Sequence, residues 1–438
     1  MAHTKYNINS LQSFSSRLVS GVDYLIVAVF ILYAGRGNTF FESGSLTQNP
    51  FGVALPLFLG TILALRWRIV FNSQFYLLIF FYFAYFIAIT IKFGEFRPTI
   101  FMNYIFIFFM VYTIVKALKK NLFIIYEKVL YVLSIIGLAL WGFQVILGGD
   151  TLFSIISHLP NISTFSNVSS QGLNIIIYSI QPSISSMVHG VPIPRNCGYA
   201  WEPGAFAVFI SLAIYINLFF INNDSGRRKR FWILLIALIS TQSTTGYMIL
   251  LLILFFFLLN KRVNTLILLS PILIIILGLL FSLPFMGEKI ADVYRQVAEI
   301  DLIIENSVTL GTSYAPGRFA SFVIAFKDFL DNPILGLGSV NEQSWTYKLG
   351  ASIGSISGIG NLLAQFGLIG FLFFTFTTIM SSILYAKMYN YRGKLFFFLI
   401  ILMISVSYSI LFLPIVMSFW AFYFFNPRET TDNGATRF

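Results

Sequence analysis

The sequence predicts an all-α polytopic membrane protein, with about 12 transmembrane helices and two long loops on one side of the bilayer. Of its 438 residues, 57% are hydrophobic and only 10% are charged, whereas charged residues make up about a quarter of a soluble globular domain. Many apolar segments approach the roughly 20 residues that a helix needs to cross a bilayer. This composition excludes a soluble protein built around one hydrophobic core.

Apolar segments that could span a membrane follow one another along the chain. The N-terminal segment before the first of them is polar and lacks a small-residue cleavage site, so we expect a retained first span and not a removed signal peptide. The predicted spans are 19–35, 51–66, 74–92, 99–116, 123–147, 203–221, 231–243, 245–260, 264–283, 359–386, 395–409 and 411–425.

Basic residues set the expected orientation, because Lys and Arg gather in cytoplasmic loops. Five basic clusters fall on one side of the membrane if both termini are cytoplasmic. The net charge of +11 therefore reflects membrane topology, and we expect no nucleic-acid partner. The clusters are Arg66 and Arg68; Lys116, Lys119 and Lys120; residues 227–230; Lys261 and Arg262; and Lys387, Arg392 and Lys394.

The segment FWILLIALISTQSTTGYMILLLILFFFLLN decides whether this orientation holds after residue 230. One long helix would place Lys261 and Arg262 on the wrong side, whereas two short helices with STQSTTG as the turn keep the charge rule. Short halves place that turn below the outer surface, where irregular backbone needs surrounding protein or water. A polar cavity that opens outward is one interpretation, and a tight turn at the lipid interface is the other. The segment 395–425 is ambiguous in the same way.

These spans divide the chain into five parts. We expect the amphipathic pattern of the second loop at Ile290, Val293, Tyr294 and Val297 to form a short helix. The parts are helices 1–5 over 1–147, outer loop one over 148–202, helices 6–9 over 203–283, outer loop two over 284–358, and helices 10–12 with a cytoplasmic tail over 359–438.

The stretch RNCGYAWEPGAF, which begins at Arg195, interrupts the apolar chain with a cation and a carboxylate. Pro203 follows Glu202 and is favoured at the first position of a helix. Glu202 therefore lies at or next to a helix N-cap, where the helix dipole favours a carboxylate. Capping alone would explain Glu202, and the alternative is a role in the reaction or in holding a catalytic arginine.

Arg318 lies in the first turn of a helix predicted to start at Pro316 and Gly317. The helix dipole disfavours a cation there, whereas the free N–H groups of a helix start attract anions and arginine offers phosphate a bidentate partner. We interpret Arg318 as an anion-binding residue; the alternative is a solvated arginine or one paired with Asp328 or Glu342. The predicted apolar face of this helix is Phe319, Phe322, Val323 and Phe326.

The remaining polar residues of the outer loops indicate an anionic, hydroxyl-rich ligand such as a lipid-linked pyrophosphoryl sugar. His158 and His189 lie in the first loop, and Trp345 of the second either stacks on a sugar or anchors the membrane interface. The segment DNPILGLG reads as scaffold that ends a helix. The single cysteine, Cys197, allows no internal disulfide, and we expect no metal or cofactor because no Cys/His cluster or carboxylate pair has suitable spacing.

Four segments in the C-terminal 250 or so residues resemble, in order, the O-antigen polymerase and O-antigen ligase superfamily of bacterial envelope enzymes. RNCGYAWEPGAFAVF is similar to its Arg…Gly…Glu-Pro segment entering a span, and LISTQSTTGYMILLL to its Ser-x-Ser-x-Thr-Gly helix break. GRFASFVIAFKDFLDNPILGLG resembles its Arg…Asn-Pro-hydrophobic-Gly-x-Gly segment, and NLLAQFGLIGFLFF the span that follows.

The resemblance implies a glycosyltransferase at the periplasmic face of the bacterial inner membrane. Its donor and acceptor would be oligosaccharides linked to undecaprenyl pyrophosphate, and a chain-length regulator would be a further partner beside the membrane lipids. Ligases of the superfamily carry a His-Asn pair about ten residues before the Gly matching Gly367, where this chain has Ile356. This departure favours a polymerase over a ligase, and the alternative from another class is a lipid-sugar flippase or transporter.

The expected roles of the site residues follow from this resemblance. Arg195 and Arg318 would stabilise the departing diphosphate, and Glu202, or else His189, would accept the proton of the acceptor hydroxyl. Trp345 and Tyr314 would join the two arginines in binding the substrate.

Overall fold

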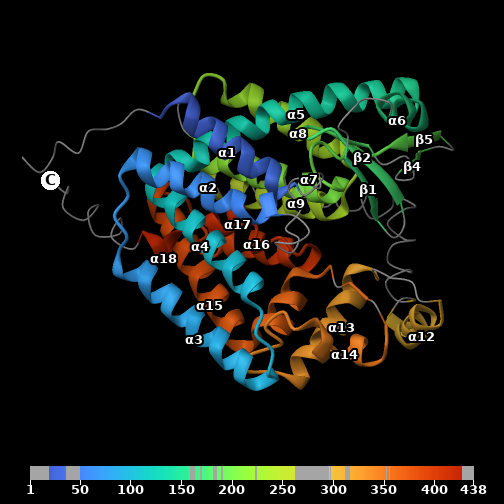
Figure 1. Ribbon diagram of the computed structural model, residues 1–438. Helices are drawn as coiled ribbons and strands as arrows, with labels where there is room; N and C mark the ends of the chain where they lie inside the picture. The colour runs from blue at the N-terminus through green and yellow to red at the C-terminus, as the bar shows by residue number, and fades with distance from the viewer. Residues whose placement is uncertain are drawn as a thin grey trace, which may run out of the picture.

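The computed structural model describes residues 19–35, 50–157, 163–167, 170–180, 185–188, 191–221, 224–261, 295, 297–310, 316–351, 353–354 and 356–426, and most of them are helical (Figure 1). Within these described ranges, five helices are long and apolar enough to cross a membrane: α2 (Pro50–Trp67), α3 (Ser73–Phe93), α4 (Pro98–Leu118), α5 (Asn121–Leu147) and α15 (Gly358–Met388). Shorter apolar helices are α1 (Gly21–Ala34), α7 (Pro203–Phe219), α9 (Thr244–Lys261) and α16 (Phe396–Ser407).

The protein is therefore an α-helical, multi-pass membrane protein, as the composition predicted. The count of about 12 spans stays a prediction, because the expected span 264–283 lies outside the described residues. The last expected span, 411–425, is divided between two short helices, α17 (Pro414–Trp420) and α18 (Phe422–Phe425).

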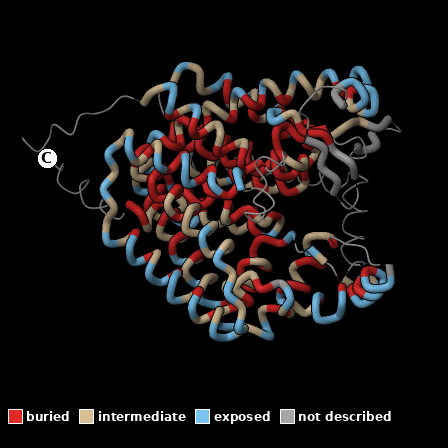
Figure 2. Tube along the Cα trace, viewed as in Figure 1, coloured by how far each residue is buried: buried red, intermediate tan, exposed pale blue. Residues whose placement is uncertain are grey.

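Helix α7 forms the centre of the main core. All of its residues except Leu218 are buried, which explains why the sequence shows no polar face there. It packs against α5, α9 and α8 (Arg227–Ser240). Figure 2 shows buried residues concentrated in the middle of the bundle and exposed ones along the outer helices.

The chain reverses direction between α8 and α9, which confirms the prediction of two short helices with a turn. The turn consists of residues 241–243. Phe231 near the start of α8 and Phe257 near the end of α9 line the same cavity, so these two helix ends lie together. At the same end, Asn260 accepts a hydrogen bond from the backbone N–H of Arg392 at 2.9 Å.

The basic clusters and the sequence-predicted arginine site lie at opposite ends of α5. Near its start, the buried Glu127 accepts hydrogen bonds from the Arg230 Nε at 2.8 and 2.9 Å. Near its far end, the Trp141 indole donates to the Pro194 carbonyl at 2.7 Å. Because a helix rises about 1.5 Å per residue, about 20 Å separates Glu127 from Trp141 along the axis.

The first outer loop contains a small packed unit that the sequence did not predict. It begins with α6 (Gly149–Ser157), and Tyr178 and Leu173 are buried in its own apolar cluster against the end of α5. The Tyr178 hydroxyl donates to Gln144 of α5 at 2.7 Å. Its antiparallel strands are β1 (Ser163–Asn167), β2 (Ser170–Asn174) and β3 (Ser179–Ile180) in one sheet, and β4 (Ser185–Val188) and β5 (Val191–Pro194) in another.

The described part of the second outer loop contains α12 (Ile300–Leu310), α13 (Arg318–Asp331), a 3₁₀ turn η3 (Asn341–Gln343) and α14 (Trp345–Lys348). Of the expected amphipathic pattern, residues 290, 293 and 294 lie outside the described residues, whereas Val297 packs against the apolar cluster of this loop.

The phenylalanine face predicted for α13 is not the face that packs against the bundle. Phe319 and Phe326 are exposed, and their rings form a row with Phe322 along the helix. The buried face instead carries small residues, because α13 lies very close to α15: a Cβ on Gly360 would stand 3.0 Å from the Cβ of Ala325. The buried residues of α13 are Ala320, Ser321, Ile324, Ala325 and Asp328.

Candidate functional site

Arg195 is held at the C-terminal end of α8 by a short, tightly bonded loop. The neighbouring Asn196 is fully buried; its backbone N–H donates to the Ser240 carbonyl at 3.1 Å and its side-chain amide to the Ser240 hydroxyl at 2.9 Å. The Arg195 Nε then donates to the Thr241 carbonyl at 3.1 Å. A cation is favoured here, because the last carbonyls of a helix carry partial negative charge.

Glu202 occupies the N-cap position of α7, as predicted, but its side chain makes no capping hydrogen bond. Its carboxylate instead lies 3.6 Å from the Arg318 guanidinium. Capping therefore does not account for this side chain. The geometry agrees with the alternative role, that of holding an arginine.

Arg318 begins α13 and makes three polar contacts besides a stacking contact. Its guanidinium faces Glu202, donates to the Tyr408 hydroxyl and lies 3.4 Å from the Thr245 hydroxyl. It also stacks on the Tyr408 ring, with 4.2 Å between the guanidinium carbon and the ring centroid. These contacts compensate for a cation at a helix start, where the dipole disfavours it.

The sequence left Asp328 and Glu342 as alternative partners for Arg318, but both carboxylates bind other groups. Asp328 is buried and accepts a hydrogen bond from the backbone N–H of Trp345 at 2.6 Å. Glu342 pairs with Arg97 in the loop before α4. Among the described residues, the carboxylate that pairs with Arg318 is Glu202.

Sequence reasoning missed the segment Ser407-Tyr408-Ser409, which ends α16 and begins the break before α17. The Ser407 hydroxyl lies 3.1 Å from that of Thr245, and Ser409 accepts a hydrogen bond from Asn361 at 3.1 Å. The Tyr408 hydroxyl contacts Arg318, and its charged neighbours are Glu202, Arg318 and Arg195. The available signal was a polar triplet inside an apolar run, shortly before Pro414.

Gly204 makes this close approach of Tyr408 possible. A Cβ placed on Gly204 would overlap the Tyr408 hydroxyl and stand 3.3 Å from the Arg318 guanidinium. The Glu-Pro-Gly sequence therefore serves two purposes, since Pro203 starts α7 and Gly204 leaves room for the tyrosine.

Both predicted arginines contact the segment that joins α8 to α9, and both are charged neighbours of Tyr408. Arg195 binds the backbone at Thr241 on one side of the turn, and Arg318 contacts Thr245 on the other. The side chains of Arg318 and Glu202 are 34% and 33% exposed, so the pair remains accessible to a ligand. Two guanidinium groups and one carboxylate leave one positive charge in excess, which suits an anionic ligand.

Among the described residues, no contact joins another predicted site residue to Arg195, Glu202 or Arg318. Trp345 contacts Lys327 and Asp328, and the Lys327 ammonium lies 3.7 Å from the centre of its ring. Lys327 follows Arg318 by more than two helical turns of α13, about 14 Å along the axis. His189 and Tyr314 lie outside the described residues.

Cys197 lies in the same loop but is fully enclosed. Burial raises the pKa of its thiol to about 12, so this cysteine stays protonated and unreactive at neutral pH. Among the described residues, no group of three His, Cys, Asp or Glu side chains is placed to hold a metal ion.

Neither a scan against protein-family models nor a search of curated proteins returned a match to this chain. The family resemblance therefore depends on the sequence motifs, and the functional argument on the geometry of the arginine site.

Proposed function

We propose that this protein is a membrane glycosyltransferase that polymerises a surface polysaccharide, such as O-antigen. It would transfer the growing glycan from undecaprenyl pyrophosphate to the non-reducing end of a new lipid-linked repeat unit. The observation that carries this proposal is the pair of guanidinium groups, Arg195 and Arg318, held at one turn at the end of the bundle remote from the basic clusters.

In this reaction an acceptor hydroxyl attacks the anomeric carbon of the donor, and the bond from that carbon to the pyrophosphate oxygen breaks. The departing pyrophosphate keeps the bonding electrons, and Arg195 and Arg318 would stabilise its charge through hydrogen bonds. Glu202 would accept the proton of the attacking hydroxyl. Tyr408 would be a positioning residue, because both its hydroxyl and its ring contact Arg318.

An apolar cavity of about 540 Å³ supports a lipid-linked substrate. It lies between α3, α4, α15 and the segment after α16, and its lining includes Leu362 and Phe412. Leu362 follows Asn361, which donates a hydrogen bond to Ser409 next to Tyr408, so these residues connect the cavity wall to the arginine site along the chain. Under this proposal it would hold part of the prenyl chain, whose burial is favourable by about 0.8 kcal/mol per methylene.

The test is polysaccharide synthesis in cells that lack their own polymerase. We expect Arg195→Ala and Arg318→Ala each to lower the polymerisation rate by about 10²–10³, as is typical when one oxyanion donor is lost. Arg318→Lys should remain impaired, since an ammonium cannot make the bidentate contact. Arg392→Ala, an exposed arginine at the opposite end, is the matched control. Long glycan ladders from both site variants would contradict the proposed role of the arginines.

Glu202→Gln tests the proton acceptor separately. Glutamine keeps the size and a hydrogen-bonding oxygen but cannot accept the proton, so we expect normal protein levels and no polymer. Purified protein supplied with lipid-linked repeats alone should form ladders. A requirement for a lipid-A acceptor would indicate a ligase, and accumulation of substrate in vesicles without bond formation would indicate a transporter.

A further inference from the structure

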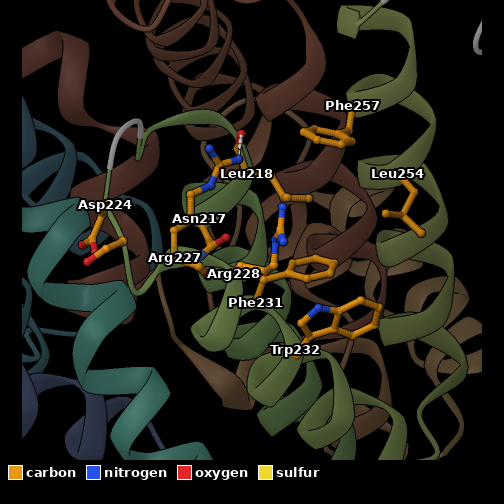
Figure 3. Close-up of a pocket in the computed structure, with 10 residues that line it drawn as sticks. Asn217, Leu218, Asp224, Arg227, Arg228, Phe231, Trp232, Leu254 and Phe257 are labelled. Carbon is orange, nitrogen blue, oxygen red and sulfur yellow. Dashed lines mark hydrogen bonds between the residues drawn. The ribbon is translucent and has the colours of Figure 1, made fainter.

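A second cavity, lined by both polar and apolar residues, lies at the opposite end of the bundle, where the chain enters α8 and leaves α9. Its volume is about 810 Å³, within the range of small-molecule sites. Figure 3 shows Arg227 and Arg228 projecting from the start of α8, with Leu254 and Phe257 of α9 on the facing wall. The proposed glycosyl transfer makes no use of this cavity.

The charges around the cavity are not balanced. Asp224 also lines it, but one of its carboxylate oxygens accepts a hydrogen bond from Arg230 at 2.9 Å and the other accepts from the backbone N–H of Gly226 at 2.9 Å. Glu127 of α5 likewise accepts hydrogen bonds from Arg230. Arg230 thus binds both carboxylates, and the three guanidinium groups of residues 227, 228 and 230 exceed the two carboxylates by one positive charge.

Neither Arg227 nor Arg228 forms a close ion pair among the described residues, although Arg227 lies near enough to Glu127 to interact with its charge. The Arg227 guanidinium donates to the Leu218 carbonyl at 3.0 Å, and the exposed Arg228 has no protein partner in the described part of the chain. Residue Gly226 at the helix start supplies no side-chain cap either. An anion would find two guanidinium groups and the positive end of a helix in one place.

The remaining wall of the cavity is apolar. Phe231 and Trp232 lie one turn into α8, and Trp232 is 54% exposed, as is typical of aromatic residues at the lipid headgroups. Leu254 and Phe257 complete this wall from α9. A ligand that fits must therefore carry a negative charge at one end and hydrocarbon at the other.

We infer that this cavity binds an anionic phospholipid, with its phosphate at Arg227 and Arg228 and its acyl chains against Phe231, Trp232, Leu254 and Phe257. Basic pockets between membrane helices bind anionic headgroups in this way. Such a lipid would bridge the start of α8 and the end of α9. Both of these helix ends lie far from the arginine site. The inference does not depend on the proposed glycosyl transfer.

Native mass spectrometry of the full-length protein in nanodiscs tests this inference. We expect the wild type to retain phosphatidylglycerol in preference to phosphatidylcholine, and the double variant Arg227→Gln/Arg228→Gln to lose at least tenfold in phosphatidylglycerol affinity. Lys229→Gln is the matched control, because it removes a charge from an exposed neighbouring position that does not line the cavity. Unchanged retention in the double variant, or an equal loss in the control, would overturn the inference.

Two further measurements separate the alternatives. Phosphatidylglycerol should raise the thermal unfolding temperature of the wild type and not that of the double variant, while both unfold in one transition without it. Inorganic phosphate serves as a headgroup without chains and should give no such shift at the same concentration. If inorganic phosphate stabilises the wild type as well as the lipid does, the cavity is an anion site and the lipid assignment is wrong.

Discussion

At the scale of single residues, helix ends explain why the two arginines are held so differently. Arg195 sits at the C-terminal end of α8, where helix carbonyls favour a cation by about 0.3–1 kcal/mol. Arg318 sits at the N-terminal end of α13, where the same effect has the opposite sign. Glu202 and Tyr408 therefore compensate Arg318, and Gly204 gives them the space to do so.

A substitution at Gly204 should disturb this arrangement directly. We expect Gly204→Ala to displace Tyr408, because the added Cβ overlaps its hydroxyl, and to destabilise the protein by about 1–3 kcal/mol through overpacking. Thermal unfolding and polymer synthesis measure the two effects. Gly142→Ala is the control, since a Cβ there meets nothing within 4 Å; similar behaviour of the two variants would contradict the predicted close contact.

At the scale of elements, the break in α15 explains the position of the glycine-rich segment after α13, because the backbones of the two segments form hydrogen bonds with each other. Gly367 has φ 59°, which interrupts the helix. The segment 333–338 uses the backbone groups that the break releases: Leu337 and Gly338 donate to the carbonyls of Ala364 and Gln365 at 2.8 Å, and Leu368 donates to Pro333 at 2.8 Å. The broken helix and the segment DNPILGLG thus form one hydrogen-bonded unit, which the sequence had indicated only as scaffold.

Gly367→Ala should destabilise this unit. The left-handed backbone costs a residue with a Cβ about 1–3 kcal/mol, and the Cβ would also overlap the Ile334 carbonyl. We expect a lower unfolding temperature in detergent and faster proteolysis after residue 331. Gly354→Ala has open space around its Cβ and should unfold like the wild type. Equal stability of both variants would show that the break tolerates a side chain.

At the scale of the whole molecule, charge divides the bundle into two ends. The start of α8 and the end of α9 carry basic residues, and Arg392 lies beside them. The arginine site lies at the other end, beside loops that also contain carboxylates such as Glu342. The positive-inside rule then predicts that the basic end is cytoplasmic and that the arginine site faces the periplasm.

Cysteine labelling on intact cells tests this orientation. Native Cys197 gives little background, because it is 1% exposed and burial raises its thiol pKa to about 12. We expect a membrane-impermeant maleimide to label Tyr347→Cys, which is exposed near α14, and to label Ser225→Cys only after the membrane is permeabilised. Labelling of Ser225→Cys alone on intact cells would reverse the orientation.

Several features of the site could be predicted from the sequence because they are local. Glu202 before Pro203 indicated a helix start, and the serine and threonine residues at 240–245 indicated a turn. The packed face of α13 could not be predicted. The sequence indicated an apolar face that includes Phe319 and Phe326, but which side packs depends on how close α15 approaches. Tyr408 could not be assigned either, because its partners are remote in the chain.

The sequence by itself determined that the chain is helical and crosses a membrane, because hydrophobic segments of span length and their basic flanks are properties of consecutive residues. It also indicated the start of α7 at Pro203 and the turn after Ser240, since Pro and Ser/Thr residues act on their own backbone, but not the break of α15 at Gly367. Only the tertiary structure decided that Arg195, Glu202, Arg318 and Tyr408 share one site. They come from three separate segments, because Arg195 and Glu202 share one loop, and their meeting depends on how closely the helices pack.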